Sequence, residues 1–113
     1  MTVDALVPAP AHQTRFAWSH HKTVPAVPGC YVIANYHGEV LYVGLAKTSI
    51  RDRMGVHLDT PAKRAAGPHG VGFWFHYLPR LPENVAQVER GWTNQAMLND
   101  GQLPPLNKVH GSM

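Results

Sequence analysis

Arg53 and His57 stand four residues apart in a stretch whose pattern predicts a helix. Residues at this spacing project from the same helix face as neighbours. A guanidinium offers a planar fork of hydrogen-bond donors that matches a phosphate group. The pair is therefore a candidate phosphate clamp, and a solvated helix face is the plainer interpretation.

Glu89 is the residue that fits its surroundings least. It falls at the edge of an apolar stripe that Val85, Val88, Trp92 and Ala96 form on a second predicted helix. Burying an unpaired carboxylate is costly, so a carboxylate on the core side needs a partner. A solvated helix edge or a salt bridge to an arginine would satisfy it. The functional alternative is a metal site, because a single carboxylate suits Mg²⁺, which keeps most of its waters.

Two tyrosines, Tyr31 and Tyr42, lie in short apolar runs between Gly29 and Gly44. The runs are rich in β-branched and aromatic residues, and a polar turn at residues 35–39 separates them. This pattern predicts a β-hairpin with a loop of about three to five residues. Tyrosines on adjacent strands can meet across a hairpin. Taken singly, each tyrosine is an ordinary core or surface residue.

Local signals predict the elements that follow the hairpin. Thr48 or Ser49 caps a helix that ends near Leu58, before Pro61. The aromatic run at residues 71–78 predicts a strand that is covered on both faces.

The last predicted element is a helix that begins at Pro82 and ends near Asn99, with Gly101 as its C-terminal cap. The order strand, strand, helix, strand, helix predicts an α+β domain with a small three-stranded antiparallel or mixed sheet flanked by helices. We expect an N-terminal extension at residues 1–26 that is partly flexible, one domain at residues 27–109, and a frayed C-terminus at residues 110–113.

Length and composition limit the possible classes of protein. A chain of 113 residues predicts a single domain, and one cysteine, Cys30, excludes an intrachain disulfide. The longest apolar run, residues 24–34, contains prolines and is far shorter than the ~20 residues of a membrane helix. The N-terminus shows no signal-peptide pattern. We therefore expect no membrane association, and a cytoplasmic or nucleoid-associated location.

Charge suggests a partner without identifying it. Ten Lys and Arg residues against seven Asp and Glu residues give a net charge of +3, which suits a phosphate-bearing partner or ordinary solubility. We expect substrate contacts at Gly44, Lys47, Lys63 and Arg64. The last two lie at residues 59–70, for which the pattern predicts a loop with room for one short turn of helix. A plain surface loop without substrate contacts is the alternative.

Taken together, these residues resemble the motifs of the GIY-YIG nuclease family. Residues 29–31, Gly-Cys-Tyr, stand where the family has GIY, and residues 42–44, Tyr-Val-Gly, stand for YIG. Arg53 and His57 match the family's Arg-x-x-x-His/Tyr pattern. Arg51 is the alternative to Arg53, and His57 four residues later favours Arg53.

The resemblance continues into the second half of the chain. Glu89 lies in the later helix where the family's metal-binding glutamate sits, and Asn107, in Pro-Pro-Leu-Asn, matches the asparagine after that helix. The resemblance covers roughly residues 27–109. Six positions in the right order, with the expected elements between them, are far more specific than either short motif alone.

The resemblance implies a DNA endonuclease that hydrolyses phosphodiester bonds with one Mg²⁺ or Mn²⁺ ion, in repair or recombination. Glu89 would hold the metal, and Tyr31 or Tyr42 would deprotonate the attacking water. Arg53 would stabilise the transition state. In the same scheme His57 relays the proton or holds a phosphate oxygen, and Asn107 orients Glu89 or the water shell of the metal.

Two other classes of protein are alternatives. A nucleic-acid-binding module could retain the fold without turnover. A zinc protein is the second, since the chain has eight histidines and one cysteine, but they lack the closely spaced pairs of a structural zinc site. The pattern leaves open whether the substrate is DNA or RNA, whether it is single-stranded or branched, and whether the chain forms oligomers.

Overall fold

The computed structural model describes residues 1–64 and 66–107 of the chain, so the predicted frayed C-terminus at 110–113 lies outside the described residues. Four strands form one sheet: β1 (His12–Arg15), β2 (Gly29–Ala34), β3 (Val40–Ala46) and β4 (Trp74–Pro79). The α-helices are α1 (Ile50–Leu58), α2 (Pro61–Arg64) and α3 (Pro82–Asp100), and two 3-10 helices are η1 (Val3–Ala5) and η2 (Trp18–Thr23). The protein has an α+β fold, as predicted.

The sheet has the order β1-β4-β2-β3, and every neighbouring pair is antiparallel. The prediction of three strands was wrong, because β1 forms the fourth strand from within the segment expected to be an extension. β1 has the sequence His-Gln-Thr-Arg and pairs with β4 at the edge of the sheet. A short, polar edge strand has no alternation of apolar and polar residues, so hydrophobic periodicity does not reveal it.

The predicted hairpin is confirmed as β2 and β3, with Tyr31 opposite Gly44 and Ile33 opposite Tyr42. Asn35 forms its turn: the side-chain Oδ1 accepts hydrogen bonds from the backbone N–H groups of residues 37 and 39, at 3.0 and 2.9 Å. Gly38 has a φ of +85°, a conformation that glycine adopts without strain.

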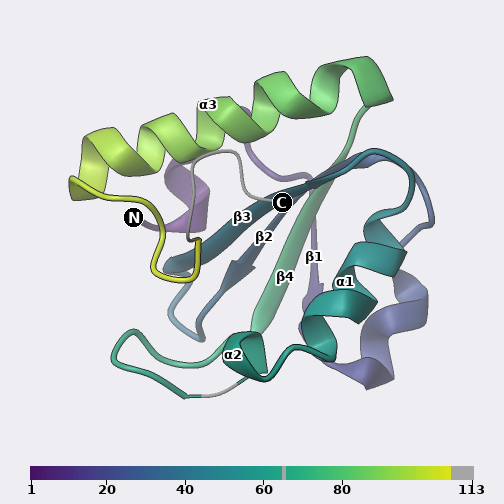
Figure 1. Cartoon of the computed structure of the whole chain (residues 1–113), viewed down its shortest axis with the longest axis horizontal. Helices are drawn as coiled ribbons and strands as arrows, with labels where there is room; N and C mark the ends of the chain where they lie inside the picture. The colour runs from purple at the N-terminus through teal and green to yellow at the C-terminus, as the bar shows by residue number, and fades with distance from the viewer. Residues whose placement is uncertain (65, 108–113) are drawn as a thin grey trace.

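Helices cover both faces of the sheet, with α1 and α2 on one face and α3 on the other (Figure 1). Successive residues of β2 point to opposite faces. Tyr31 and Ile33 join the core under α1, whereas Cys30 and Val32 join the core under α3. All six residues of β2 are buried, because this strand lies inside the sheet and between the helices.

The helix boundaries follow the predicted caps. The hydroxyl oxygen of Ser49 accepts a hydrogen bond from the backbone N–H of Asp52 at 3.1 Å, and α1 ends at Leu58. At the end of α3, Gly101 has a left-handed φ of 76°, and its N–H bonds to the carbonyl of Met97. Within the described ranges, no helix is long and apolar enough to cross a membrane.

Residues 1–8 pack against α3. The indole Nε1 of Trp92 donates to the carbonyl of Pro8 at 2.8 Å, and the side chain of Gln95 bonds both backbone groups of Val7. The N-terminal amine pairs with Asp100 at 3.0 Å. Val3 and Leu6 are buried in the core under α3, so this segment closes one end of that face.

Candidate functional site

The face of the sheet under α1 brings four of the predicted site residues into contact. Tyr31 Oη lies 2.8 Å from His57 Nε2, and Arg53 Nε donates to the same Oη at 3.4 Å. The ring of Tyr42 meets the His57 ring edge-on at 4.7 Å between centroids. We call Tyr31, Tyr42, Arg53 and His57 the tyrosine–histidine cluster.

Sheet register and helix spacing position the cluster. Tyr31 and Tyr42 come from paired strands and point to the same face, with ring centroids 6.3 Å apart. Arg53 and His57 lie one turn apart on α1, so both point down onto that face. The predicted spacing of these four residues therefore agrees with the observed contacts.

Gly44 provides the space for the Tyr31 ring. A Cβ atom built on Gly44 would lie 2.5 Å from both Cζ and Oη of Tyr31, closer than a real contact permits. The phenol thus packs directly on the backbone of β3, with Phe75 stacked at 5.3 Å between centroids. This packing fixes the hydroxyl of Tyr31 in front of His57. Gly44 therefore serves to seat Tyr31, whether or not it also contacts a substrate.

Burial keeps both partners of the central hydrogen bond neutral. Tyr31 is fully buried, which raises the pKa of its hydroxyl, and the charge of Arg53 opposes that rise. The pKa of His57 is lowered to about 3, mainly by burial and also by the charges of Lys63 and Arg53. A neutral imidazole and a neutral phenol therefore meet at pH 7.

The imidazole of His57 has one nitrogen left to bond. Nε2 faces Tyr31, whereas the buried Nδ1 has no hydrogen-bond partner among residues 1–64 and 66–107. The hydrogen bond runs in either direction, depending on which tautomer is present. A neutral imidazole bonded to a phenol can take up the phenolic proton through Nε2, which is the property a proton relay needs.

The predicted substrate-contact residues take different places. Lys63, on α2, lies over the Tyr42 ring at 4.7 Å and adds its charge to the cluster. Arg64 instead donates to the carbonyl of Leu58 at 3.1 Å, and Lys47 is exposed just beyond β3. Of the three predicted basic contact residues, Lys63 is the one that the fold brings to the cluster.

Glu89 lies on the other face of the sheet. It is 2% exposed in α3, beside Cys30, whose pKa is raised to about 12 by burial and by the charge of Glu89. Burial also raises the pKa of Glu89, and Arg90 opposes that shift. Its Oε2 has no hydrogen-bond partner in the part of the chain that the structure describes. The pattern placed Glu89 at the edge of the apolar stripe, and the structure buries it, so a solvated helix edge is wrong. The fold does not bring Glu89 to the tyrosine–histidine cluster.

Asn107 holds the backbone of the edge strand β3. Its Oδ1 accepts from Val43 N–H and its Nδ2 donates to the Val43 carbonyl, both at 2.9 Å. The side-chain amide thus behaves like one more residue of a neighbouring strand. It supports the strand that carries Tyr42 and Gly44, and the side chain is 7% exposed.

The donor set for a metal is limited. Among the described residues, no group of three or more His, Cys, Asp or Glu side chains gathers as a ligand set. The buried carboxylate of Glu89 has the donor chemistry for a hydrated Mg²⁺, which needs few protein ligands. α3 holds this carboxylate on the face opposite the cluster, however.

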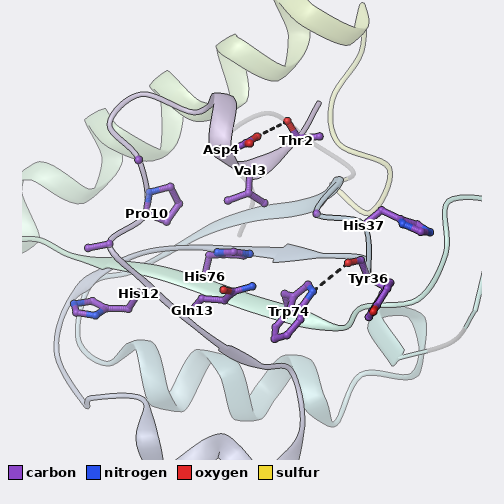
Figure 2. A pocket seen from close by; sticks show the side chains of 13 residues that line it. Thr2, Val3, Asp4, Pro10, His12, Gln13, Tyr36, His37, Trp74 and His76 are labelled. Atoms are coloured by element: carbon purple, nitrogen blue, oxygen red, sulfur yellow. Dashed lines mark hydrogen bonds between the residues drawn. The ribbon is translucent and has the colours of Figure 1, made fainter.

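Sequence reasoning passed over one group of polar residues under α3. His76 alternates with Phe75 and Tyr77 in β4, and with Gln13 it lines a large pocket (Figure 2). The sequence shows a histidine, His76, within an aromatic strand. The pocket also needs Gln13 from β1, and the sequence pattern does not predict that strand.

Comparison with known proteins does not assign a function to the cluster. None of the protein-family models matches the chain, and no curated protein is similar to it in sequence. The likeness to the GIY-YIG motifs therefore stays a prediction, and the geometry of the cluster is the basis for assigning a function.

The close contact at Gly44 predicts a loss of stability in Gly44→Ala. The added methyl group would displace Tyr31 from a fully packed site, at a cost of about 1–3 kcal/mol. Urea denaturation monitored by circular dichroism measures this cost. Gly91→Ala in α3 is the matched control, because a Cβ added there would meet no neighbouring atom within 4 Å and alanine favours a helix. Equal stability of the two variants would refute the role assigned to Gly44.

The lowered pKa of His57 predicts a stability that falls as the pH drops from about 6.5 toward 3. In that window the unfolded chain binds a proton at His57 that the folded chain does not bind. Its contribution to the slope approaches about 1.4 kcal/mol per pH unit. Chemical denaturation of wild type and His57→Gln across this range isolates the effect, because other groups, including His76, titrate in both proteins. Parallel pH profiles would contradict a buried, neutral His57.

Proposed function

We propose that this chain is a minimal nuclease of the GIY-YIG kind that hydrolyses phosphodiester bonds in DNA. The observation that supports the proposal is the 2.8 Å hydrogen bond between Tyr31 Oη and a neutral His57, next to the Arg53 guanidinium. A proton donor, a proton acceptor and a phosphate-binding cation meet there at one point. Hydrolysis of a phosphodiester needs all three functions.

Arg53 and Lys63 are the residues proposed to bind the phosphate. Both are partly exposed and lie above the buried rings of the cluster, and Lys63 sits over Tyr42. Arg53 contacts Tyr31 through Nε, and a guanidinium has five N–H donors in a fork that suits a phosphate. A phosphate there would place its phosphorus near the Tyr31 hydroxyl.

Tyr31 and His57 form the proposed proton path. The pKa of Tyr31 is raised, so a free tyrosinate is not the base at pH 7. Instead, water passes a proton to Tyr31 Oη as Tyr31 passes its own proton to His57 Nε2. The hydroxide forms a new bond to phosphorus as the bond from phosphorus to the leaving oxygen breaks, and the leaving oxygen takes a proton from solvent. His57 carries the positive charge until it returns its own proton to solvent. Of the two tyrosines, Tyr31 is favoured because its hydroxyl bonds to His57.

Substrate charge would help this transfer. Burial lowers the pKa of His57 most, and the charges of Lys63 and Arg53 add to this shift in the free protein. A bound phosphate neutralises these two charges, so the pKa of His57 rises when the substrate is present. The imidazole thus becomes a better base at the moment when a base is needed.

Mg²⁺ is the proposed cofactor, and Glu89 is the residue that would hold it. A metal held by Glu89 would supply positive charge to phosphate groups on the side of α3. Because Glu89 lies across the sheet from Tyr31, this role applies only to a substrate that also reaches the side of α3. The requirement for Mg²⁺ and the proton transfer through Tyr31 are therefore tested with separate variants.

The second candidate function is binding of nucleic acid without cleavage. The observation that favours it is the separation of Glu89 from the cluster, combined with burial of Tyr31 and His57. Incubation with supercoiled plasmid and with single-stranded, branched and RNA oligonucleotides separates the two functions. Retarded mobility in a gel without any product in Mg²⁺ or Mn²⁺ would support the second function.

Tyr31→Phe is expected to slow cleavage by about 100-fold or more, because a general base contributes ~10²–10⁴ to the rate. The measurement is the initial rate of plasmid nicking. Tyr77→Phe is the control, since it removes a hydroxyl from the same face, outside the cluster, and should change the rate less than about threefold. A loss below about tenfold in Tyr31→Phe, worth ~1.4 kcal/mol of barrier, would place the base elsewhere.

Glu89→Gln is expected to abolish the Mg²⁺-dependent cleavage while the protein stays folded, because the substitution keeps shape and removes the carboxylate charge. Nicking rates over a Mg²⁺ titration, with a chelator as the zero point, measure this. If the variant responds to Mg²⁺ as wild type does, Glu89 does not hold the metal. If wild type cleaves DNA equally fast in the presence of the chelator, the reaction at the tyrosine–histidine cluster does not depend on a metal.

A further inference from the structure

A second site lies on the face of the sheet under α3, at the edge formed by β1. A pocket of about 580 Å³ opens there, within the range of ligand-binding pockets. Its floor is β1 and β4, and its walls are the N-terminal segment and the β2–β3 turn (Figure 2). The tyrosine–histidine cluster belongs to the opposite face, so the pocket is a separate site.

The floor of the pocket carries two polar side chains side by side. Gln13 on β1 is paired in register with His76 on β4, so both point to the same face. The Nε2 atom of His76 is buried and has no hydrogen-bond partner within the described chain. Burial lowers the pKa of His76, so the ring is neutral at pH 7. A side-chain amide and a neutral imidazole each provide a hydrogen-bond donor and an acceptor.

Flat aromatic surface and an acceptor complete the lining. Trp74 lies two residues before His76 on the same face, and its Nε1 donates to the carbonyl of Tyr36 at 3.2 Å, which fixes the indole. Asp4, in the opposite wall, accepts a hydrogen bond from the Thr2 hydroxyl at 2.6 Å. Its carboxylate can also accept from an amino group of a ligand.

Charge and donor geometry narrow the class of ligand. Among the described residues that line the pocket there is no lysine or arginine, and Asp4 is negative, so a phosphate is disfavoured. No metal-binding group of three His, Cys, Asp or Glu side chains forms in the described ranges, even though three histidines line this pocket. The lining instead suits a neutral, planar ring with hydrogen-bonding edges.

We infer that this pocket binds a neutral nucleobase, with its edge on Gln13 and His76, its ring against Trp74 and an exocyclic amino group toward Asp4. A side-chain amide can bond an adenine edge through two hydrogen bonds, and a carboxylate accepts from a base amino group. Stacking of a base on an aromatic side chain adds to such binding. Adenine therefore fits better than thymine. The base comes either from a free nucleoside or from an unpaired position in a strand.

Isothermal titration calorimetry of the full chain with adenosine, thymidine and ribose 5-phosphate tests the inference. We expect adenosine to bind with a Kd of about 1 mM or tighter, and thymidine to bind more weakly. Gln13→Ala and His76→Phe should each weaken adenosine binding by about fivefold or more. Thr14→Ser is the matched control, because Thr14 pairs with Phe75 on the other face. Gln13 is exposed, so its variant keeps the fold even if the His76 variant does not.

A second titration distinguishes the two sources of the base. A duplex with one unpaired adenine is compared with the fully paired duplex, on wild type and Gln13→Ala. A preference for the unpaired adenine that Gln13→Ala removes assigns the pocket to a strand, and adenosine binding without such a preference assigns it to a free nucleoside. Absence of both, or equal binding of ribose 5-phosphate, overturns the inference. Neither titration involves cleavage, so a protein that binds adenosine but cuts nothing would refute the proposed function alone.

Discussion

The packing of the Tyr31 ring on the backbone of Gly44 is the contact on which the candidate site depends. Because residue 44 lacks a Cβ, the phenol packs closely against β3 and its hydroxyl reaches His57 on α1. Only in that register does His57 meet the hydroxyl at 2.8 Å. A shift of one residue between β2 and β3 would turn Tyr31 toward α3 and leave the His57 imidazole without this partner.

Burial gives the cluster its chemistry and also limits its stability. A phenol and an imidazole that are both neutral exchange a proton without a prior change of charge, but each has lost most of its contact with water. His57 Nδ1, which has no hydrogen-bond partner among the described residues, adds a desolvation cost. The apolar packing around the site, including Phe75, offsets this desolvation cost. A phosphate bound to Arg53 and Lys63 would neutralise the positive charges that lie beside His57.

Local interactions made part of this fold predictable. The hairpin, the Ser49 cap and the Gly101 cap each depend on neighbours within a few residues, and so does the pairing of Arg53 with His57 on one helix face. The side of the sheet on which a helix lies depends on the whole topology. Spacing on α3 placed Glu89 at the edge of the apolar stripe, but it carries no information on which face of the sheet α3 covers. The polar strand β1 was missed because edge strands need no apolar alternation.

The residues hidden from pattern analysis are the ones that form the second pocket. β1 supplies Gln13, and residues 1–8 are held by side-chain hydrogen bonds from Trp92 and Gln95 of α3 and by backbone hydrogen bonds to the β2–β3 hairpin. The spacing of apolar residues in a sequence shows which positions form the core. It does not show which polar residues the fold brings together at a binding surface. His76 illustrates both points, since its strand is fixed by Phe75 and Tyr77 while its own ring faces the pocket. The sheet thus carries the tyrosine–histidine cluster on one face and the residues of the second pocket on the other. The order of its strands positions both groups.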